Sequence, residues 1–253
     1  MKVTFLGTAG STISAHRTYP SILINDDFLL DCGEGTTQKL VSLGYIDDIS
    51  IICITHLHND HFLGIFSLLW YWYINQREKP LHLISPPNIQ KTIEQILDLT
   101  NTPESMRKSF EIHYSPLKNI EGMQKLDTKY KINALKMEHL DPTFGFRISH
   151  RGRIVAYSGD SRPNENLVKL AKNCNLLIGE ATYSDSLKDL AEEHFHSTPS
   201  QMARVAQRGG CKKLALVHIS PFFHGKLQDF QENAAQIFKG DIIIPQDLDV
   251  LEL

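Results

Sequence analysis

Residues 51–61 read IICITHLHNDH, an apolar run followed at once by four potential metal ligands. The apolar run is typical of a buried strand, so it delivers the hexad His56–His61 to one place in the fold. Imidazole and carboxylate groups are ordinary ligands of zinc and similar divalent ions. The chain has 12 histidines, and so dense a cluster of them is not expected by chance. The stretch therefore predicts a metal site, and its ligand number favours a site for two ions.

A two-ion site needs more ligands than the hexad supplies, and three candidates lie in the second half of the chain. Each of them follows the C-terminal end of a predicted strand, as the hexad does, so all can converge on one edge of the fold. Gly159 permits a sharp turn before one of them. One ion would be held by His56, His58 and His139 and the other by Asp60, His61 and His218, with Asp160 as the bridge. A hydroxide between two ions becomes a nucleophile, chemistry that suits phosphodiester or strained acyl hydrolysis.

Bulk composition sets the broad class of the protein. The 253 residues are 42% hydrophobic and 22% charged, which is typical of a globular chain, and no linker or low-complexity tract divides them. We therefore expect one domain, residues 1–253. The net charge of −3 gives no global basic field, so nucleic-acid binding would need a local patch.

The cysteines and the lengths of the apolar runs indicate where in the cell the protein is located. Four scattered cysteines without a C-x-x-C pair predict buried free thiols in a reducing cytosol, and hence a cytoplasmic protein. The N-terminus reads as a strand without the apolar segment of a signal peptide. No apolar run reaches the length of a membrane span, so we expect no membrane association.

The order of predicted elements indicates the fold. Strands and then alternating strands and helices occur twice, a pattern that fits two sheets packed face to face with helices outside. A helix from residue 199 has a clear start, since Thr198 and Gln201 can form a capping box around Pro199. The predicted strands are 2–6, 21–24, 27–31, 49–55, 81–84, 110–114, 130–137, 144–148, 153–157, 175–179, 213–218 and 248–252. The predicted helices are 35–43, 62–75, 88–99, 164–172, 199–208 and 228–238.

At the metal-ligand residues the chain resembles the metallo-β-lactamase superfamily and, within it, the ribonuclease Z family. Seven strings spread over nearly the whole chain carry the resemblance: Phe5–Thr8, Asp31–Thr36, Thr55–His61, Tyr157–Pro163, Glu180–Thr182, His196–Thr198 and His218–Ser220. The resemblance implies an α/β fold, the four-layer αββα sandwich of that superfamily. It also implies a metal-dependent hydrolase with two Zn²⁺ ions, although the same ligands suit Mn²⁺ and Fe²⁺.

Residue roles follow from the same resemblance. Asp31 would brace the metal loop from behind the ligands. Asp60 would be a ligand that also orients the attacking hydroxide. His196, polarised by Glu180, would be the general acid that protonates the leaving alkoxide. A ribose alkoxide is a poor leaving group, and a histidine is suited to deliver its proton.

The implied function is phosphodiester hydrolysis of the ribonuclease Z type, with transfer-RNA 3′ processing as the inherited activity and an RNA 3′ end as substrate. Family members are commonly dimers, so a homodimer is possible. Three departures from the family stand out. Residues 140–159 leave room for one hairpin only, where bacterial members insert a tRNA-binding arm; Gly179 replaces the histidine of an H-E-A-T string; and Pro221–Phe223 replaces an arginine and tyrosine.

Three other functions remain open. A phosphodiesterase of small or cyclic nucleotides is the main alternative, which the missing arm favours. A lactonase or thioesterase is less favoured, because acyl leaving groups need no acid such as the pair formed by Glu180 and His196. A catalytically silent binding subunit has little support, because all seven ligand positions are occupied by ligand residues.

Overall fold

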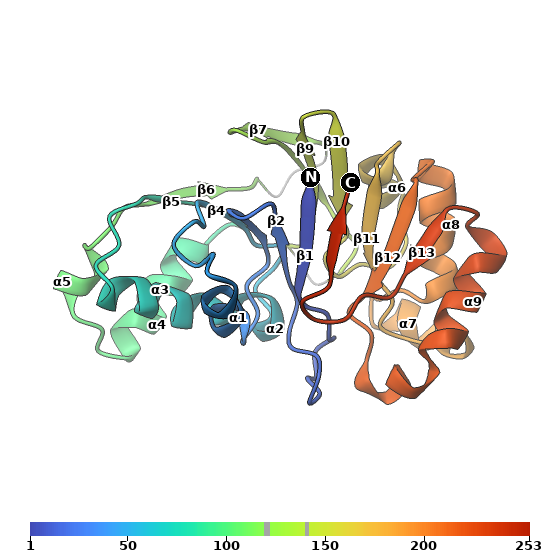
Figure 1. The fold of residues 1–253 in the computed structure, drawn as a ribbon, viewed down its shortest axis with the longest axis horizontal. Helices are drawn as coiled ribbons and strands as arrows, with labels where there is room; N and C mark the ends of the chain where they lie inside the picture. The colour runs from blue at the N-terminus through green and yellow to red at the C-terminus, as the bar shows by residue number, and fades with distance from the viewer. Residues whose placement is uncertain (119–121, 140–141) are drawn as a thin grey trace.

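Two sheets lie face to face at the centre of the protein (Figure 1). The structure is a computed structural model, and it describes residues 1–118, 122–139 and 142–253. Over these residues each sheet has seven strands. The first sheet runs in the order β14 (Val250–Glu252), β1 (Lys2–Gly7), β2 (Ser21–Ile24), β3 (Phe28–Leu30), β4 (Ile51–Cys53), β5 (Leu81–Ser85) and β6 (Ile112–Pro116). Its last four strands are parallel neighbours, and the others pair antiparallel.

The second sheet repeats this mixture of parallel and antiparallel pairing. Its order is β13 (Asp241–Ile243), β12 (Lys213–Val217), β11 (Leu176–Glu180), β10 (Arg153–Tyr157), β9 (Phe144–His150), β8 (Lys131–Lys136) and β7 (Gln124–Asp127). The strands β10 to β13 are parallel, so the loops that follow them leave the sheet at one edge. The chain ends come together in the first sheet, where β14 pairs with β1 (Figure 1).

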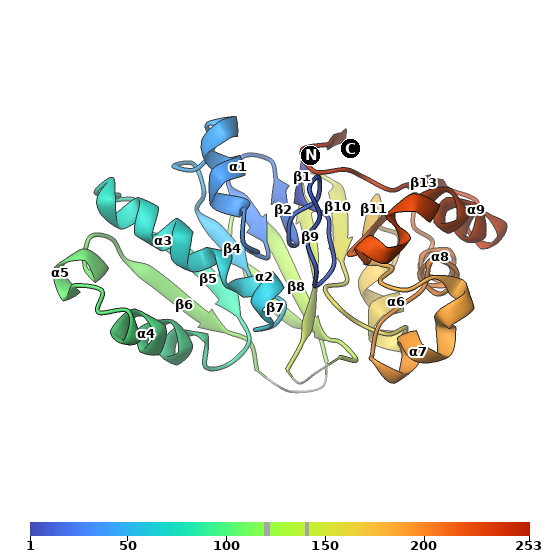
Figure 2. The same ribbon diagram turned by 90° about the horizontal axis from the view of Figure 1, so that it is seen from below.

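Helices cover the outer face of each sheet (Figure 2). The first half contributes α1 (Thr36–Leu43), α2 (Asn59–Phe62), α3 (Gly64–Ile74), α4 (Ile89–Leu99) and α5 (Glu104–Arg107). The second half contributes α6 (Glu165–Ala171), α7 (Lys188–Glu193), α8 (Pro199–Gly209) and α9 (Leu227–Ile237), with the 3₁₀ turns η1 (Asp185–Leu187) and η2 (Pro221–Lys226). Within the described ranges, no helix has both the length and the apolar character needed to cross a membrane.

The apolar core forms three layers. Side chains from both sheets, among them Phe5, Phe28, Phe146 and Val155, fill the space between the sheets. A second layer packs the first sheet against α1, α3 and α4, and a third packs the other sheet against α6, α8 and α9. This alternation of helix, sheet, sheet and helix is the predicted αββα sandwich, and that prediction is confirmed.

Several element boundaries differ from the predicted ones. The predicted strand 49–55 ends at Cys53, because Thr55 donates its backbone N–H to the carboxylate of Asp31 instead of a neighbouring strand. The predicted helix 62–75 corresponds to α3, which spans Gly64–Ile74, and the short helix α2 before it was not predicted. The short elements α5, α7, β7 and β13 were not predicted. The capping box around Pro199 is confirmed, with the Thr198 hydroxyl accepting from Gln201 N–H.

Candidate metal centre

The ends of strands from both sheets converge on one group of acidic and histidine side chains. The hexad follows β4, and three of its four ligand candidates are buried. From the second sheet, His139 follows β8, Asp160 follows β10 and His218 follows β12. The hexad and these three residues therefore meet at the edge of the sandwich, as the sequence predicts. Their contact with metal ions stays a prediction.

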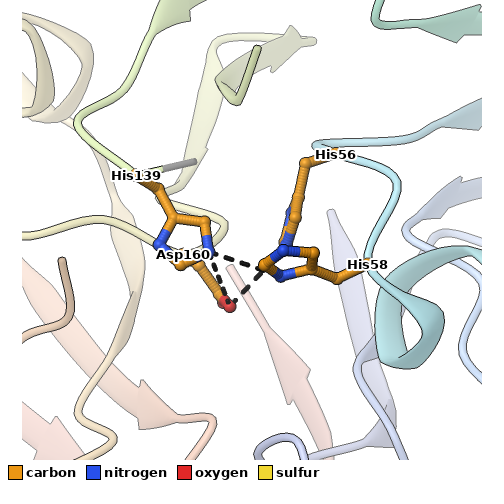
Figure 3. A group of neighbouring side chains, drawn as sticks. All are labelled: His56, His58, His139 and Asp160. Carbon is orange, nitrogen blue, oxygen red and sulfur yellow. Dashed lines mark hydrogen bonds and ion pairs between the residues drawn. The ribbon is translucent and has the colours of Figure 1, made fainter. Parts of the chain in front are cut away.

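Four of these residues form what we call the His56 group: His56, His58, His139 and Asp160 (Figure 3). Nδ1 of His58 lies 3.4 Å from Nε2 of His139. Oδ2 of Asp160 lies 3.8 Å from Nε2 of His56 and 3.9 Å from Nε2 of His139. All four can offer ligand atoms within 4.8 Å of one another, so the group can hold one ion.

A second set, the His61 group, comprises Asp60, His61, Asp160 and His218. Nε2 of His218 lies 3.4 Å from Oδ2 of Asp60 and also 3.4 Å from Oδ1 of Asp160. Nε2 of His61 lies 3.2 Å from the same Oδ1. Asp160 therefore turns one oxygen to each group, which is the position of a bridging carboxylate.

Several buried polar atoms in these groups lack a hydrogen-bond partner. They are Nε2 of His56, Nε2 of His61 and Oδ1 of Asp160. The last two atoms lie 3.2 Å apart, but they are not aligned as a hydrogen bond. Unpaired buried polar atoms are costly, so three of them at one point indicate a ligand that the protein itself does not supply. Two imidazole nitrogens and a carboxylate oxygen suit a divalent cation.

The protonation of the His56 group also suits metal binding. Burial lowers the pKa of His56 well below its usual value, and burial likewise lowers the pKa values of His58 and His139. Their rings are therefore neutral near pH 7, and neutral imidazole is the form that binds a metal.

The second ring nitrogen of most of these histidines is held by a neighbour. In the first half of the chain, Nδ1 of His56 lies 3.0 Å from the Thr55 hydroxyl, and Nδ1 of His61 lies 2.7 Å from Oδ2 of Asp31. In the second half, Nδ1 of His139 lies 3.2 Å from the Phe195 carbonyl, and Nδ1 of His218 lies 2.8 Å from the Thr182 hydroxyl. When Nδ1 donates its proton to such a partner, Nε2 keeps its lone pair free for a metal. The four rings are thus oriented with Nε2 toward the centre.

Asp31 braces the hexad from beneath, as the resemblance implies. Its carboxylate is fully buried and accepts hydrogen bonds from the Thr55 backbone at 2.7 Å, from the Thr55 hydroxyl at 3.0 Å and from the Tyr157 hydroxyl at 2.8 Å. Together with its bond to His61, these contacts fix the loop that carries the ligands. Because Tyr157 belongs to the second sheet, Asp31 also links the two halves of the sandwich.

The buried Glu180 and the partly buried His196 form a pair beside the His61 group. Oε1 of Glu180 accepts from Nδ1 of His196 at 2.9 Å. Burial is the largest single influence and lowers the pKa of His196, but the charge of Glu180, its hydrogen bond to the ring and the charge of Asp160 together outweigh burial and raise the pKa to about 9. The His196 ring centroid lies 5.0 Å from that of His139 and 5.6 Å from that of His218, so the ring borders both ligand groups.

Thr182 joins this pair to the metal ligands. Its hydroxyl donates to Oε2 of Glu180 at 2.6 Å and accepts from Nδ1 of His218 at 2.8 Å. In the other half of the centre, the Thr55 hydroxyl likewise donates to Oδ2 of Asp31 and accepts from Nδ1 of His56. Sequence reasoning missed both hydroxyls, although each threonine lies within a string that resembles the family.

Close packing explains two glycines near the centre. Gly159 has a φ of +56°, and a Cβ there would lie 2.8 Å from Cγ2 of Thr55, so only glycine lets the Asp160 loop approach the hexad. Gly179 lies under α8, where a Cβ would come within 2.4 Å of the side chain of Met202. The histidine that the family carries at that position therefore has no room here, because Met202 fills the space.

Comparison with known proteins agrees with this architecture. The family model described as "Beta-lactamase superfamily domain" matches residues 27–219. The chain therefore belongs to the β-lactamase superfamily.

Closer relatives refine this assignment. Ribonuclease Z of Archaeoglobus fulgidus is 30% identical, with 96% of this chain and 94% of the relative covered. Human tRNase Z, short form, has a solved structure that is 28% identical and superposes with a TM-score of 0.81, covering 100% of this chain and 99% of that one. Within the superfamily the chain belongs to the ribonuclease Z family, and it is a metal-dependent hydrolase.

The alignment with one relative contains positions that this chain lacks. Ribonuclease Z of Natronomonas pharaonis is 28% identical over 306 aligned positions that include 100% of this chain and 98% of the relative. Because this chain has 253 residues, 53 of those positions have no residue in it.

Proposed function

We propose that the protein is a phosphodiesterase of the ribonuclease Z type that cleaves RNA near its 3′ end, with two Zn²⁺ ions at the His56 and His61 groups. The observation that carries this proposal is the Glu180–His196 pair, held at 2.9 Å beside both ligand groups. Bound ions would lower the pKa of an attacking water and neutralise charge on the phosphodiester. The shared carboxylate of Asp160 fits a centre that holds both ions.

The chain's own residues would position the substrate and handle its protons. Asp60, whose side chain is 3% exposed, would orient the attacking water while it binds an ion. His196 holds a proton and keeps its side chain 14% exposed, so it can reach the leaving oxygen of a bound ester. Glu180 would stabilise the charged ring and fix its direction. A ribose oxygen leaves poorly without a proton, and this pair supplies one.

A small-molecule or cyclic-nucleotide phosphodiesterase is the second candidate. The 53 positions missing relative to the Natronomonas ribonuclease Z favour it, since fewer residues remain to grip a large RNA. The chemistry of the site is the same for both substrates. A lactonase or thioesterase fits less well, because the Glu180–His196 pair has no task when the leaving group is stable.

One panel of substrates separates these functions. The purified protein, loaded with zinc or manganese, is incubated with a precursor tRNA, 2′,3′- and 3′,5′-cyclic nucleotides, bis-p-nitrophenyl phosphate and a set of lactones. We expect cleavage of the phosphodiesters, with the precursor tRNA cut at its 3′ side. Cleavage of lactones without any phosphodiester would contradict the proposal, and cleavage of cyclic nucleotides alone would select the second candidate.

Two further properties belong to the same proposal. We expect a cytoplasmic protein, since its four cysteines are free and buried. The family resemblance makes a homodimer possible, and sedimentation velocity measures the oligomeric state directly. Elemental analysis of the isolated protein would identify the ions.

A further inference from the structure

Two buried cysteines meet at the end of the second sheet that is remote from the metal centre. Cys174 precedes β11 and Cys211 precedes β12, and their Sγ atoms are 3.2 Å apart. Cys174 is inaccessible to solvent, whereas Cys211 is 9% exposed. Both thiols are free, and 37 residues separate them in the chain.

The backbone holds this pair in register. Strands β11 and β12 are parallel neighbours with Leu176 opposite Lys213, and Cys174 and Cys211 each lie two residues earlier. The Lys212 backbone N–H donates to the Cys174 carbonyl at 3.0 Å, so the pairing extends back to the cysteines. Neighbouring strands lie about 4.8 Å apart, within the Cα separation of about 4.4–6.8 Å that a disulfide spans. An S–S bond of about 2.05 Å therefore requires the sulfurs to approach by roughly 1 Å.

We propose that Cys174 and Cys211 are an oxidisable pair, which a hydroperoxide converts into a disulfide that joins the starts of β11 and β12. The Cys211 sulfur attacks the peroxide, the O–O bond breaks, and the thiol becomes a sulfenic acid while the peroxide is reduced to an alcohol or water. The Cys174 sulfur then attacks the Cys211 sulfur. The S–S bond forms, the S–O bond breaks, and the hydroxyl leaves as water with the Cys174 proton.

The surroundings assign these two roles. Cys211 is the more exposed of the two residues, and its sulfur accepts from the Cys174 S–H while its own S–H donates to the Ala171 carbonyl at 3.3 Å, so we assign the first attack to Cys211. The same contact, together with burial, raises the pKa of the Cys174 thiol, so Cys174 keeps its proton until the second step. The Arg147 guanidinium interacts electrostatically with both sulfurs.

The other two cysteines provide an internal control. Cys32 and Cys53 are fully buried, and burial raises the pKa of the Cys32 thiol to about 12 and that of Cys53 as well. They are therefore expected to stay reduced while the protein is folded. A Cys53→Ser variant tests whether loss of an arbitrary buried thiol changes the outcome.

The experiment treats the full chain with hydrogen peroxide and follows it by intact mass and by peptide mapping without reduction. We expect a loss of two hydrogen masses, a peptide linking Cys174 to Cys211, reversal by dithiothreitol, and a thermal midpoint several degrees higher in the oxidised form. Cys53→Ser should give the same cross-link. In Cys174→Ser, Cys211 should stop at a sulfenic acid that dimedone traps.

Several results would overturn the inference. They are the absence of the cross-linked peptide after peroxide treatment of the folded protein, or a cross-link through Cys32 or Cys53 instead. Because none of these measurements uses catalytic activity, the result is independent of whether the protein cleaves phosphodiesters.

Discussion

Thr182 and His218 are joined by a hydrogen bond of 2.8 Å from Nδ1 of the ring to the threonine hydroxyl. The hydroxyl has one proton, and it donates that proton to Glu180. The ring must therefore carry its own proton on Nδ1, which leaves Nε2 of His218 free for an ion. A single carboxylate thus supports the general-acid candidate His196 directly and a metal-ligand candidate through Thr182.

Replacement of this hydroxyl should weaken metal binding. Thr182→Val keeps the shape of the side chain but cannot accept from His218, so we expect a loss of roughly 10- to 100-fold in metal affinity or activity. Thr182→Ser retains the hydroxyl and should stay close to wild type. Metal titration followed by calorimetry measures the effect, and equal affinities for the valine and serine variants would refute the role.

The leaving group should decide how much His196 matters. His196→Ala removes the proton donor, so hydrolysis of an alkyl phosphodiester should fall by roughly 10²- to 10⁴-fold, whereas a p-nitrophenyl ester, whose leaving group needs no proton, should lose far less. Steady-state kcat values on the two ester types provide the comparison. His194→Ala is the matched control, since that ring bonds to the Tyr183 hydroxyl outside both ligand groups. Equal losses on both esters would assign His196 a structural role.

Metal content should follow the division into two ligand groups. His58 belongs only to the His56 group, so His58→Ala should lower the bound metal from two ions to one per chain while the His61 group keeps its own. Plasma emission spectrometry of the dialysed protein measures the ratio. His113→Ala, which removes a histidine from β6 outside the ligand groups, should leave it unchanged. Unchanged metal content in His58→Ala would exclude His58 as a ligand.

The contact between Gly179 and Met202 should limit stability. A methyl group at Gly179 would overlap the Met202 side chain, so Gly179→Ala should lower the free energy of unfolding by about 1–3 kcal/mol. Adding Met202→Ala makes room, so the double variant should be more stable than the sum of the single effects predicts. Urea unfolding of the four proteins measures the coupling, and strict additivity would show that the two positions do not compete for space.

The sequence was sufficient to predict the sandwich and the convergence of the ligand candidates. The hexad is contiguous, and His139, Asp160 and His218 each follow a strand, so the edge where strands end is visible from the pattern of residues. The Asp31 brace was available only from the family resemblance. The roles of these residues stay predictions. So does the expectation that residues 1–253 form a single domain.

Other features depend on tertiary contacts that no local pattern contains. Thr55 leaves its strand early because Asp31, distant in sequence, accepts its N–H. The fit of Met202 against Gly179 and the hydroxyl bond of Thr182 likewise join separate segments. The short elements α5, α7, β7 and β13 have too few residues to show a periodicity.

Each ligand group draws its members from both sheets. The His56 group combines two residues that follow β4 with two that follow β8 and β10, and the His61 group does the same with Asp60 and His61 on one side and Asp160 and His218 on the other. Ions bound there would cross-link the two sheets at the edge where both ligand groups lie. Their binding energy would then add to the cohesion of the whole sandwich. Removal of the ions by a chelator would weaken the packing of the two sheets against each other. Amide hydrogen exchange would then become faster in both sheets, not only in the loops that hold the ions.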